Sequence, residues 1–151
     1  MLIYVILLVV TQKECKVFFA KNMNFQEIFS QPLADTKELS PIVLAFVGDG
    51  VHTLYVRDRV VKNSNLLVNS CHKLSSKHCN AKAQAGKLDV IKDILTEEEQ
   101  DIVRRARNAK VNNIAKNADL ETYKKATSFE ALVGYLYLKG DYKRLKQILD
   151  M

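Results

Sequence analysis

The sequence predicts an all-α domain, and three observations support this prediction. The chain has 151 residues, of which 48% are hydrophobic, and this suits one domain with a substantial core. Apolar side chains recur at helical spacing in segments of roughly 8 to 20 residues, the usual length of helices in globular proteins. We find neither alternating strand patterns nor internal repeats, and two prolines with five glycines are few for the many turns of an all-β fold.

Residues 1–22 stand apart from the rest of the chain. Leu2 to Val10 is an unbroken apolar run of nine residues, whereas a membrane-spanning helix needs about 20. The run lacks the positively charged start and the small-residue cleavage site of a signal peptide. We interpret residues 1–22 as an N-terminal extension from a translation start placed too early, with Met23 as the initiator, and expect no membrane partner. A genuine extra strand or a membrane-adhering tail is the alternative.

A long apolar run from Ile42 to Val61 predicts the first long helix. Ser40 is a typical N-cap residue, and Pro41 fits the first helical position. Within the run, Asp49 has a glycine on either side. A buried carboxylate without a partner is costly, and each interior glycine costs a helix roughly 1 kcal/mol. Both costs suggest that another group approaches Asp49 closely, and a metal ion carrying a phosphate is the obvious candidate.

A second helix is expected to begin after Thr96. The hydroxyl of Thr96 and the carboxylate of Glu99 have the spacing of a capping box, in which each side chain bonds the other residue's backbone N–H. Arg104, Arg105 and Arg107 follow in the last turns, where positive charge complements the helix dipole.

A further helix is predicted over residues 127–136, with Phe129, Leu132, Val133 and Leu136 facing the core. Glu130 lies on another face of this helix.

Gly134 follows Glu130 by one turn on that face, where its missing side chain permits a close approach. If the two helices cross there, Asp49 and Glu130 can share a divalent cation. Hard carboxylate oxygens suit Mg²⁺ or Mn²⁺, and Mg²⁺ typically keeps several waters beside one or two protein carboxylates. As an alternative, Thr127 and Glu130 fit a capping box, in which the acid only bonds its own helix.

Positive charge is concentrated in two stretches of the chain, within a net charge of +6 and a pI of about 9.2. The stretch from Arg104 to Lys125 holds seven basic residues against two acids, and the other stretch follows Leu66. Basic surfaces attract the phosphate backbone regardless of sequence, and double-stranded RNA is read mostly by shape. A solvated charged face is the alternative. The side chains that we expect to contact RNA are Arg107, Asn108, Lys110, Lys116, Asn117, Lys73, Lys77 and Lys82.

The three cysteines, Cys15, Cys71 and Cys79, form neither a disulfide framework nor a standard zinc spacing. Reduced cysteines of this kind are typical of a cytoplasmic protein. As an alternative, the Cys71-His72 and His78-Cys79 pairs could hold a metal ion.

The acidic motifs belong to a longer series of segments that together match one known pattern. The series is Leu44–Gly50 with Tyr55–Arg57, His72–Ser76, Ala81–Ala85, Arg107–Lys110, Lys116–Asn117 with Asp119 and Thr122–Tyr123, and Phe129–Leu136. In these segments the chain resembles the catalytic domain of the ribonuclease III family, specifically its short bacterial Mini-III branch. The resemblance covers residues 23–151, in one order.

This resemblance implies an all-α ribonuclease III-type endonuclease domain without a separate double-stranded-RNA-binding domain. It implies a metal-dependent endoribonuclease that cuts double-stranded RNA, with Asp49 and Glu130 as catalytic ligands of Mg²⁺, for which Mn²⁺ can substitute. It further implies a homodimer, with the Ile42–Val61 helix expected at the interface. The implied substrate is the precursor of the large-subunit (23S) ribosomal RNA. We expect substrate choice to come either from the catalytic domain itself or from a protein already on the RNA, such as a ribosomal protein, and we expect the enzyme in the cytoplasm.

The chain departs from the family pattern at four positions. Full-length ribonuclease III enzymes carry glutamates where this chain has Ile42 and Ala45, and an aspartate where it has Thr127. Loss of these acids is typical of the Mini-III branch. That branch commonly has alanine at Gly50, so we expect the glycine to loosen the helix slightly.

Two other classes of function remain open at this stage. One is a non-catalytic ribonuclease III-fold RNA-binding protein in ribosome assembly, and the other is a helical adaptor whose acids only cap and pair. The presence of both Asp49 and Glu130 argues against the first class. In the second class the basic face would bind an acidic protein, and competition by duplex RNA would separate it from an RNA-binding enzyme. His52, near Asp49, is a candidate acid–base group, but chemistry by metal-bound water would make it unnecessary.

Overall fold

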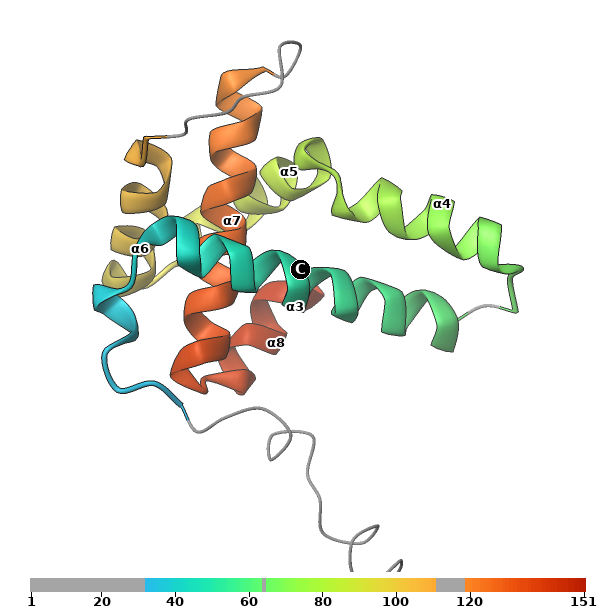
Figure 1. The fold of residues 1–151 in the computed structure, drawn as a ribbon, viewed down its shortest axis with the longest axis horizontal. Helices are drawn as coiled ribbons and strands as arrows, with labels where there is room; N and C mark the ends of the chain where they lie inside the picture. The colour runs from blue at the N-terminus through green and yellow to red at the C-terminus, as the bar shows by residue number, and fades with distance from the viewer. Residues whose placement is uncertain (1–31, 64, 111–118) are drawn as a thin grey trace, which may run out of the picture. The chain divides into compact units, whose positions relative to one another are not determined.

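A computed structural model describes residues 32–63, 65–110 and 119–151, and every regular element in these ranges is a helix (Figure 1). This confirms the predicted fold class. Residues 33–151 form one compact unit. The N-terminal extension of residues 1–22 lies outside the described residues. The elements are η2 Thr36–Glu38, α3 Pro41–Lys62, α4 Val68–Cys79, α5 Ala81–Ile91, η3 Lys92–Ile94, α6 Glu97–Asn108, α7 Leu120–Lys139 and α8 Tyr142–Asp150.

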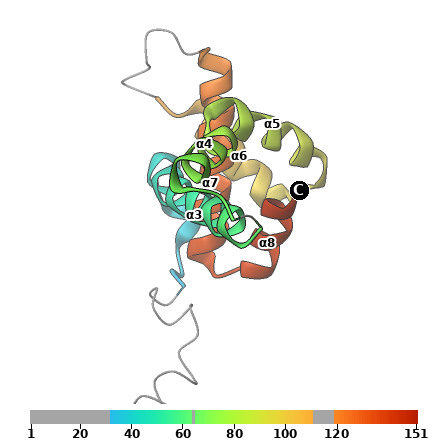
Figure 2. The ribbon, with the colours of Figure 1, turned by 90° about the vertical axis from the view of Figure 1, so that its right-hand side faces the viewer.

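Helix α7 is the centre of the unit and packs against α3, α5, α6 and α8 (Figures 1 and 2). A helix that is covered on most sides must be apolar nearly all round. Accordingly, Phe129, Leu132, Val133 and Leu136 are all at most 2% exposed, as predicted for the core. Within the described ranges, no helix is long and apolar enough to cross a membrane.

The start of α7 differs from the prediction. The helix begins at Leu120, because the carboxylate of Asp119 accepts hydrogen bonds from the backbone N–H groups of Glu121 and Thr122 and caps the helix there. Thr127 is therefore buried in the helix interior. The alternative in which Thr127 and Glu130 form a capping box is wrong.

The other predicted helix starts are confirmed. Helix α3 begins with Ser40 as N-cap and Pro41 as its first residue, and it extends the predicted Ile42–Val61 helix by one residue at each end. Helix α6 begins with the predicted capping box, in which Thr96 and Glu99 each accept a bond from the other's backbone N–H. Arg105 and Arg107 lie in its last turn.

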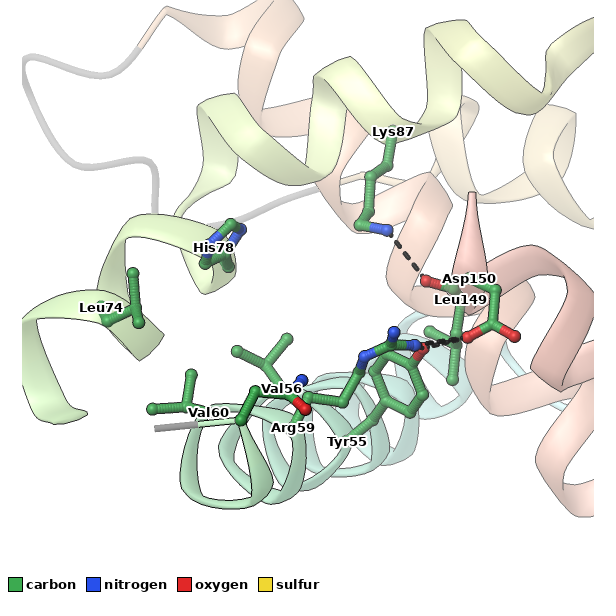
Figure 3. A pocket seen from close by; sticks show the side chains of 10 residues that line it. Tyr55, Val56, Arg59, Val60, Leu74, His78, Lys87, Leu149 and Asp150 are labelled. Carbon is green, nitrogen blue, oxygen red and sulfur yellow. Dashed lines mark hydrogen bonds and ion pairs between the residues drawn. The ribbon is translucent and has the colours of Figure 1, made fainter. Parts of the chain in front are cut away.

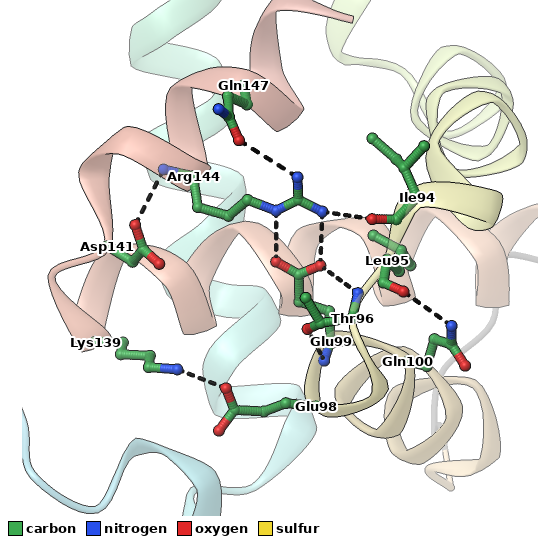
Figure 4. A network of polar contacts seen from close by, with 10 residues as sticks. All are labelled: Ile94, Leu95, Thr96, Glu98, Glu99, Gln100, Lys139, Asp141, Arg144 and Gln147. Carbon is green, nitrogen blue, oxygen red and sulfur yellow. Dashed lines mark hydrogen bonds and ion pairs between the residues drawn. The ribbon is translucent and has the colours of Figure 1, made fainter.

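A buried ion pair ties α6 to α8 (Figure 4). Glu99 is only 3% exposed, and its two carboxylate oxygens accept hydrogen bonds from Arg144 at 2.8 and 2.9 Å. Arg144 also donates to the carbonyl of Ile94 at 2.8 Å. Burial alone would raise the pKa of Glu99, but the hydrogen bonds from Arg144 and Thr96 outweigh it and hold that pKa below its usual value. This acid serves the fold.

Candidate active site

Two glycines allow α3 and α7 to cross with their backbones in contact. A Cβ atom at Gly48 would collide with the carbonyl oxygen of Glu130, and one at Gly134 would collide with the carbonyl oxygen of Leu44. The close approach predicted for Gly134 is confirmed. Around Gly50, in contrast, a Cβ atom would meet nothing within 4 Å. Of the two glycines beside Asp49, only Gly48 is needed for packing within this chain. The group that approaches it is the backbone of α7.

The crossing brings Asp49 and Glu130 together, as the spacing of acids and glycines predicted. Asp49 is exposed and Glu130 is partly buried. The pKa of Glu130 rises to about 7, first because the carboxyl is buried and then because the charge of Asp49 repels a second negative charge. A hydrogen bond from Gln84 acts in the opposite direction.

The donor set fits a hard divalent cation. Among the described residues, neither Asp49 nor Glu130 forms an ion pair, so no positive side chain in these ranges pairs with either carboxylate to offset their mutual repulsion. Within the same ranges no group of three or more His, Cys, Asp or Glu side chains could hold a metal. Ala45 and Thr127, which stand where larger relatives carry acids, are buried. Two carboxylates completed by water and phosphate oxygens are a typical set for Mg²⁺.

Sequence reasoning missed a polar contact beside this pair. Gln84, on α5, is 2% exposed, and its amide nitrogen lies 3.4 Å from Nδ1 of His52, on α3. A signal was available, because Gln84 shares the buried face of its helix with Leu88 and Ile91, where a polar side chain is unexpected. What it contacts could not be seen from the sequence.

His52 is fully buried. Its ring and the ring of Phe129 pack edge to face, with their centres 5.2 Å apart. Burial, then the positive charges of Lys87 and His78, lower the pKa of His52 to about 4. The imidazole is therefore neutral at neutral pH and closed to solvent, which agrees with the expectation that it is not the acid–base group.

The cysteines do not form a metal centre in the described part of the chain. Cys71 and Cys79 are free thiols at the two ends of α4. Cys79 lies near the acidic pair: burial raises the pKa of its thiol, a hydrogen bond with Thr53 opposes this, and the charge of Asp49 adds to it.

The side chains expected to bind RNA fall into two groups. Lys73 and Lys77 are exposed on α4, and Lys82 is exposed at the start of α5. The other group is exposed at the end of α6 and just after it, and consists of Arg107, Asn108 and Lys110. Two further predicted residues, Lys116 and Asn117, lie outside the described residues.

Part of the basic stretch between α6 and α7 serves the fold. Arg105 donates to the carbonyl of Leu39 at 3.0 Å, and Lys125 pairs with Asp89 at 2.8 Å. Arg107 forms an exposed ion pair with Glu121. Exposed pairs contribute at most about 1 kcal/mol, so Arg107 can exchange this partner for a phosphate.

A cavity of about 360 Å³ lies elsewhere, between the second half of α3 and helices α4, α5 and α8 (Figure 3). Arg59 pairs with Asp150 at 2.6 Å on its wall, and Lys87 donates to the carbonyl of Leu149 at 3.0 Å. A hydrogen bond from Lys146, then one from Tyr55, lower the pKa of Asp150 to about 2. The cavity lining includes neither Asp49 nor Glu130.

Comparison with known proteins identifies the family to which this fold belongs. The Ribonuclease III domain family matches residues 42–141. A Mini-ribonuclease 3 from Thermoanaerobacter sp. (strain X514) is 52% identical over 113 residues, which cover 75% of this chain and 80% of that protein. A Mini-ribonuclease 3 from Symbiobacterium thermophilum is 44% identical over 118 residues, which cover 78% of this chain and 91% of that protein. The crystal structure of protein FN1578 from Fusobacterium nucleatum has a TM-score of 0.70 and 29% identity, covering 77% of this chain and 93% of that one.

These matches show that the chain belongs to the ribonuclease III family. Within this family it falls in the Mini-ribonuclease III branch, as the resemblance of its motifs implied, and it is an endoribonuclease. The all-α endonuclease fold and the enzyme class expected from the sequence are confirmed.

Proposed function

We propose that this endoribonuclease cleaves double-stranded RNA with a divalent metal ion held by Asp49 and Glu130, Mg²⁺ in the cell and Mn²⁺ as a substitute. The observation that carries the proposal is the acidic pair at the glycine crossing of α3 and α7. One exposed and one partly buried carboxylate lie close together, and the described residues offer them no basic partner. A cation from solution would remove the repulsion between them.

Each side chain has a defined task in this proposal. Asp49 is exposed to solvent, and in this proposal its carboxylate meets the metal-bound phosphate of the RNA. Glu130 is held by the central helix and loses its remaining proton when a cation binds, because a ligating carboxylate must be ionised. When bound by these two residues, a divalent cation would lower the pKa of a water molecule and would add positive charge to offset the charge of the phosphate. The neutral, buried His52 moves no proton to or from the substrate.

A homodimer would place two such centres on the two strands of a duplex. In support, the face of α3 turned away from α7 is apolar and open: Val43, Phe46 and Leu54 are 48%, 82% and 51% exposed. Phe46→Glu should therefore give a monomer by light scattering. Leu67→Glu is the matched control, because Leu67 is also 82% exposed but lies outside α3. Dimers in both variants would contradict this interface.

We further propose that the substrate is the precursor of the large-subunit (23S) ribosomal RNA in the cytoplasm. This choice rests on the Mini-III resemblance. A ribosomal protein on the RNA is the proposed helper for selecting the cleavage site. Cleavage of this precursor, compared with an unrelated duplex of equal length, tests the choice.

The experiment that tests the function is incubation with a long RNA duplex, with and without Mg²⁺, for the wild type and Asp49→Asn. The substitution is nearly isosteric and removes only the charge of a ligand, so cleavage should cease while the fold persists. Residual activity within about threefold of wild type, less than 1 kcal/mol in the barrier, would remove Asp49 from the metal site.

The basic stretch after α6 is proposed to bind the RNA backbone rather than the bases. Replacing Lys110 and Lys116 by alanine should lower affinity about equally for unrelated duplexes. The slope of log affinity against log salt should become shallower by up to about two, since each lost phosphate contact removes a released counterion. A fixed salt slope, or a loss confined to one sequence, would contradict a backbone contact.

A further inference from the structure

Gln84 joins the acidic pair to the interior of the protein. It extends from α5, is 2% exposed, and contacts one residue on each of the two crossing helices: His52 on α3 at 3.4 Å and Glu130 on α7 by a hydrogen bond. A buried side-chain amide normally satisfies its hydrogen-bonding groups. Here the two contacts are a neutral ring nitrogen and one of the two carboxylates.

The hydrogen-bonding chemistry of the three groups fixes their roles. An ionised carboxylate can only accept, so Gln84 serves Glu130 as a donor. The amide nitrogen carries two hydrogens, enough for a carboxylate oxygen and for Nδ1 of His52. Nδ1 then acts as an acceptor, and the imidazole carries its proton on Nε2.

The burial of an imidazole here is otherwise unexplained. Nε2 of His52 is buried without a hydrogen-bond partner among the described residues, and a buried unpaired donor costs about 1–3 kcal/mol. A purely apolar side chain would pack against Phe129 without this cost. The contact of Nδ1 with Gln84 is what the imidazole adds.

We infer that Gln84 is a positioning residue that orients the Glu130 carboxylate for metal binding, and that buried His52 orients the Gln84 amide in turn. The inference rests on the proposed function, because it assumes that Glu130 is a metal ligand. Side chains that hold a ligating group by a hydrogen bond typically change metal affinity or activity 10- to 100-fold when they are replaced.

The test measures Mn²⁺ binding by calorimetry on the RNA-free protein, together with kcat and KM for duplex RNA and the midpoint of thermal unfolding. Gln84→Met keeps the length of the side chain and removes its donors. Gln100→Met is the control for the substitution itself, because Gln100 is an exposed residue of α6 whose amide, within the described ranges, donates to the backbone carbonyl of Leu95 and to no acid. Gln84→Met should weaken Mn²⁺ binding at least about tenfold and lower kcat, with KM for RNA nearly unchanged.

A second pair of variants tests the role of His52 and does not depend on the Gln84 variant folding. His52→Asn leaves a polar side chain that can accept near the position of Nδ1, whereas His52→Leu has a similar size and accepts nothing. Mn²⁺ affinity should stay near wild type in His52→Asn and fall several-fold in His52→Leu.

Two results would overturn the inference alone, with the wild type still binding Mn²⁺ and cutting RNA. One is a Gln84→Met protein with the Mn²⁺ affinity of the Gln100→Met control, whatever its midpoint, and the other is equal affinity in the two His52 variants. A wild type that binds no Mn²⁺ and cuts no duplex would overturn the proposed function itself, and this inference with it.

Discussion

Buried Glu99 and partly buried Glu130 show how the same residue type can have two different roles in one protein. Glu99, between α6 and α8, is held by two charge-assisted bonds from Arg144 and by the N–H of Thr96 (Figure 4). Glu130, at the crossing of α7 with α3, has a second carboxylate, Asp49, as its charged neighbour. The pKa of Glu99 is held below its usual value, and the pKa of Glu130 is raised to about 7.

The difference teaches how a structural acid can be told from a functional one. A buried charge is tolerated when the fold supplies its counter-charge, and Glu99 has one. The fold brings Asp49 toward Glu130, and the described residues supply no positive partner for either acid; in the proposed function a cation from solution takes that role. Burial of an acid is therefore less informative than the sign of the charge beside it.

The largest expected effect is a difference in cleavage rate between variants of the two acids. Glu130→Gln should lower the rate of duplex RNA cleavage at least about a thousandfold, which corresponds to about 4 kcal/mol in the barrier. Glu99→Gln should leave the rate of the folded protein near that of wild type. Both rates are measured well below the unfolding midpoints, and a comparable loss in both variants would erase the distinction.

The next effect separates them by stability. Glu99→Gln removes the charge to which the Arg144 guanidinium is doubly hydrogen-bonded, so it should destabilise the protein by about 3 kcal/mol. The neighbouring Glu98 is the control, because it pairs with Lys37 and Lys139 at the surface, and Glu98→Gln should cost less than about 1 kcal/mol. Urea unfolding measures both free energies, and equal losses would show that the buried pair adds little.

The crossing that creates the Glu130 environment can itself be disturbed. Gly48→Ala places a methyl group against the backbone of α7 and should destabilise the protein by about 2–3 kcal/mol. Gly50→Ala meets open space in this chain and should stabilise it by up to about 1 kcal/mol. Thermal midpoints decide between them, and two variants that shift in the same direction would contradict the packing described here.

The smallest effect is a dependence of stability on pH with opposite signs for the two acids. The pKa of Glu130 is raised from 4.5 to about 7 in the folded state, so the stability it contributes is complete below pH 4.5 and is lost as the pH rises to about 7. Because the pKa of Glu99 is lowered in the folded state, Glu99 contributes stability at pH values above its usual pKa. This contribution is lost as the pH falls into the acid range.

Wild type and Glu130→Gln should accordingly have similar free energies of unfolding near pH 4.5. Above pH 7 the variant should be more stable, by on the order of 2 kcal/mol once partial exposure is allowed for. Mg²⁺ should narrow this gap by binding the wild type. Denaturant unfolding at a series of pH values measures both free energies. If the free energies of wild type and Glu130→Gln changed in parallel with pH, the charge of Glu130 would not be destabilised by Asp49 and burial.

Local patterns in the sequence predicted much of the fold because they act within one helix. Ser40 and Pro41 at the start of α3 and the Thr96–Glu99 capping box each involve residues a turn or less apart. The start of α7 was missed because the pattern of apolar residues begins after the helix does. Asp119, whose carboxylate accepts hydrogen bonds from the N–H groups of Glu121 and Thr122, was the local signal for the true start of the helix.

The acidic pair was predictable for a different reason, and its surroundings were not. An acid beside a glycine on each of two apolar helices indicates a close crossing without any knowledge of the rest of the fold. Which of the two glycines contacts the other helix depends on the side of α3 that faces α7. Gly48 and Gly50 therefore look alike in the sequence, but only Gly48 meets the backbone of α7. The contact of Gln84 with His52 joins residues 32 apart in sequence and depends on how three helices pack.

Backbone contact at the crossing of α3 and α7 fixes the separation of the two helix backbones that carry Asp49 and Glu130, whatever side chains fill the rest of the core. Main-chain atoms meet there, so that separation cannot be adjusted by choosing larger or smaller residues nearby. Thermostable versions could therefore be sought by redesigning core positions on α6 and α8, for example around Ile102 and Ile148, without changing the backbone separation at the crossing. The same rigidity makes the pair of crossing helices a candidate for transfer as one block into a designed helical scaffold.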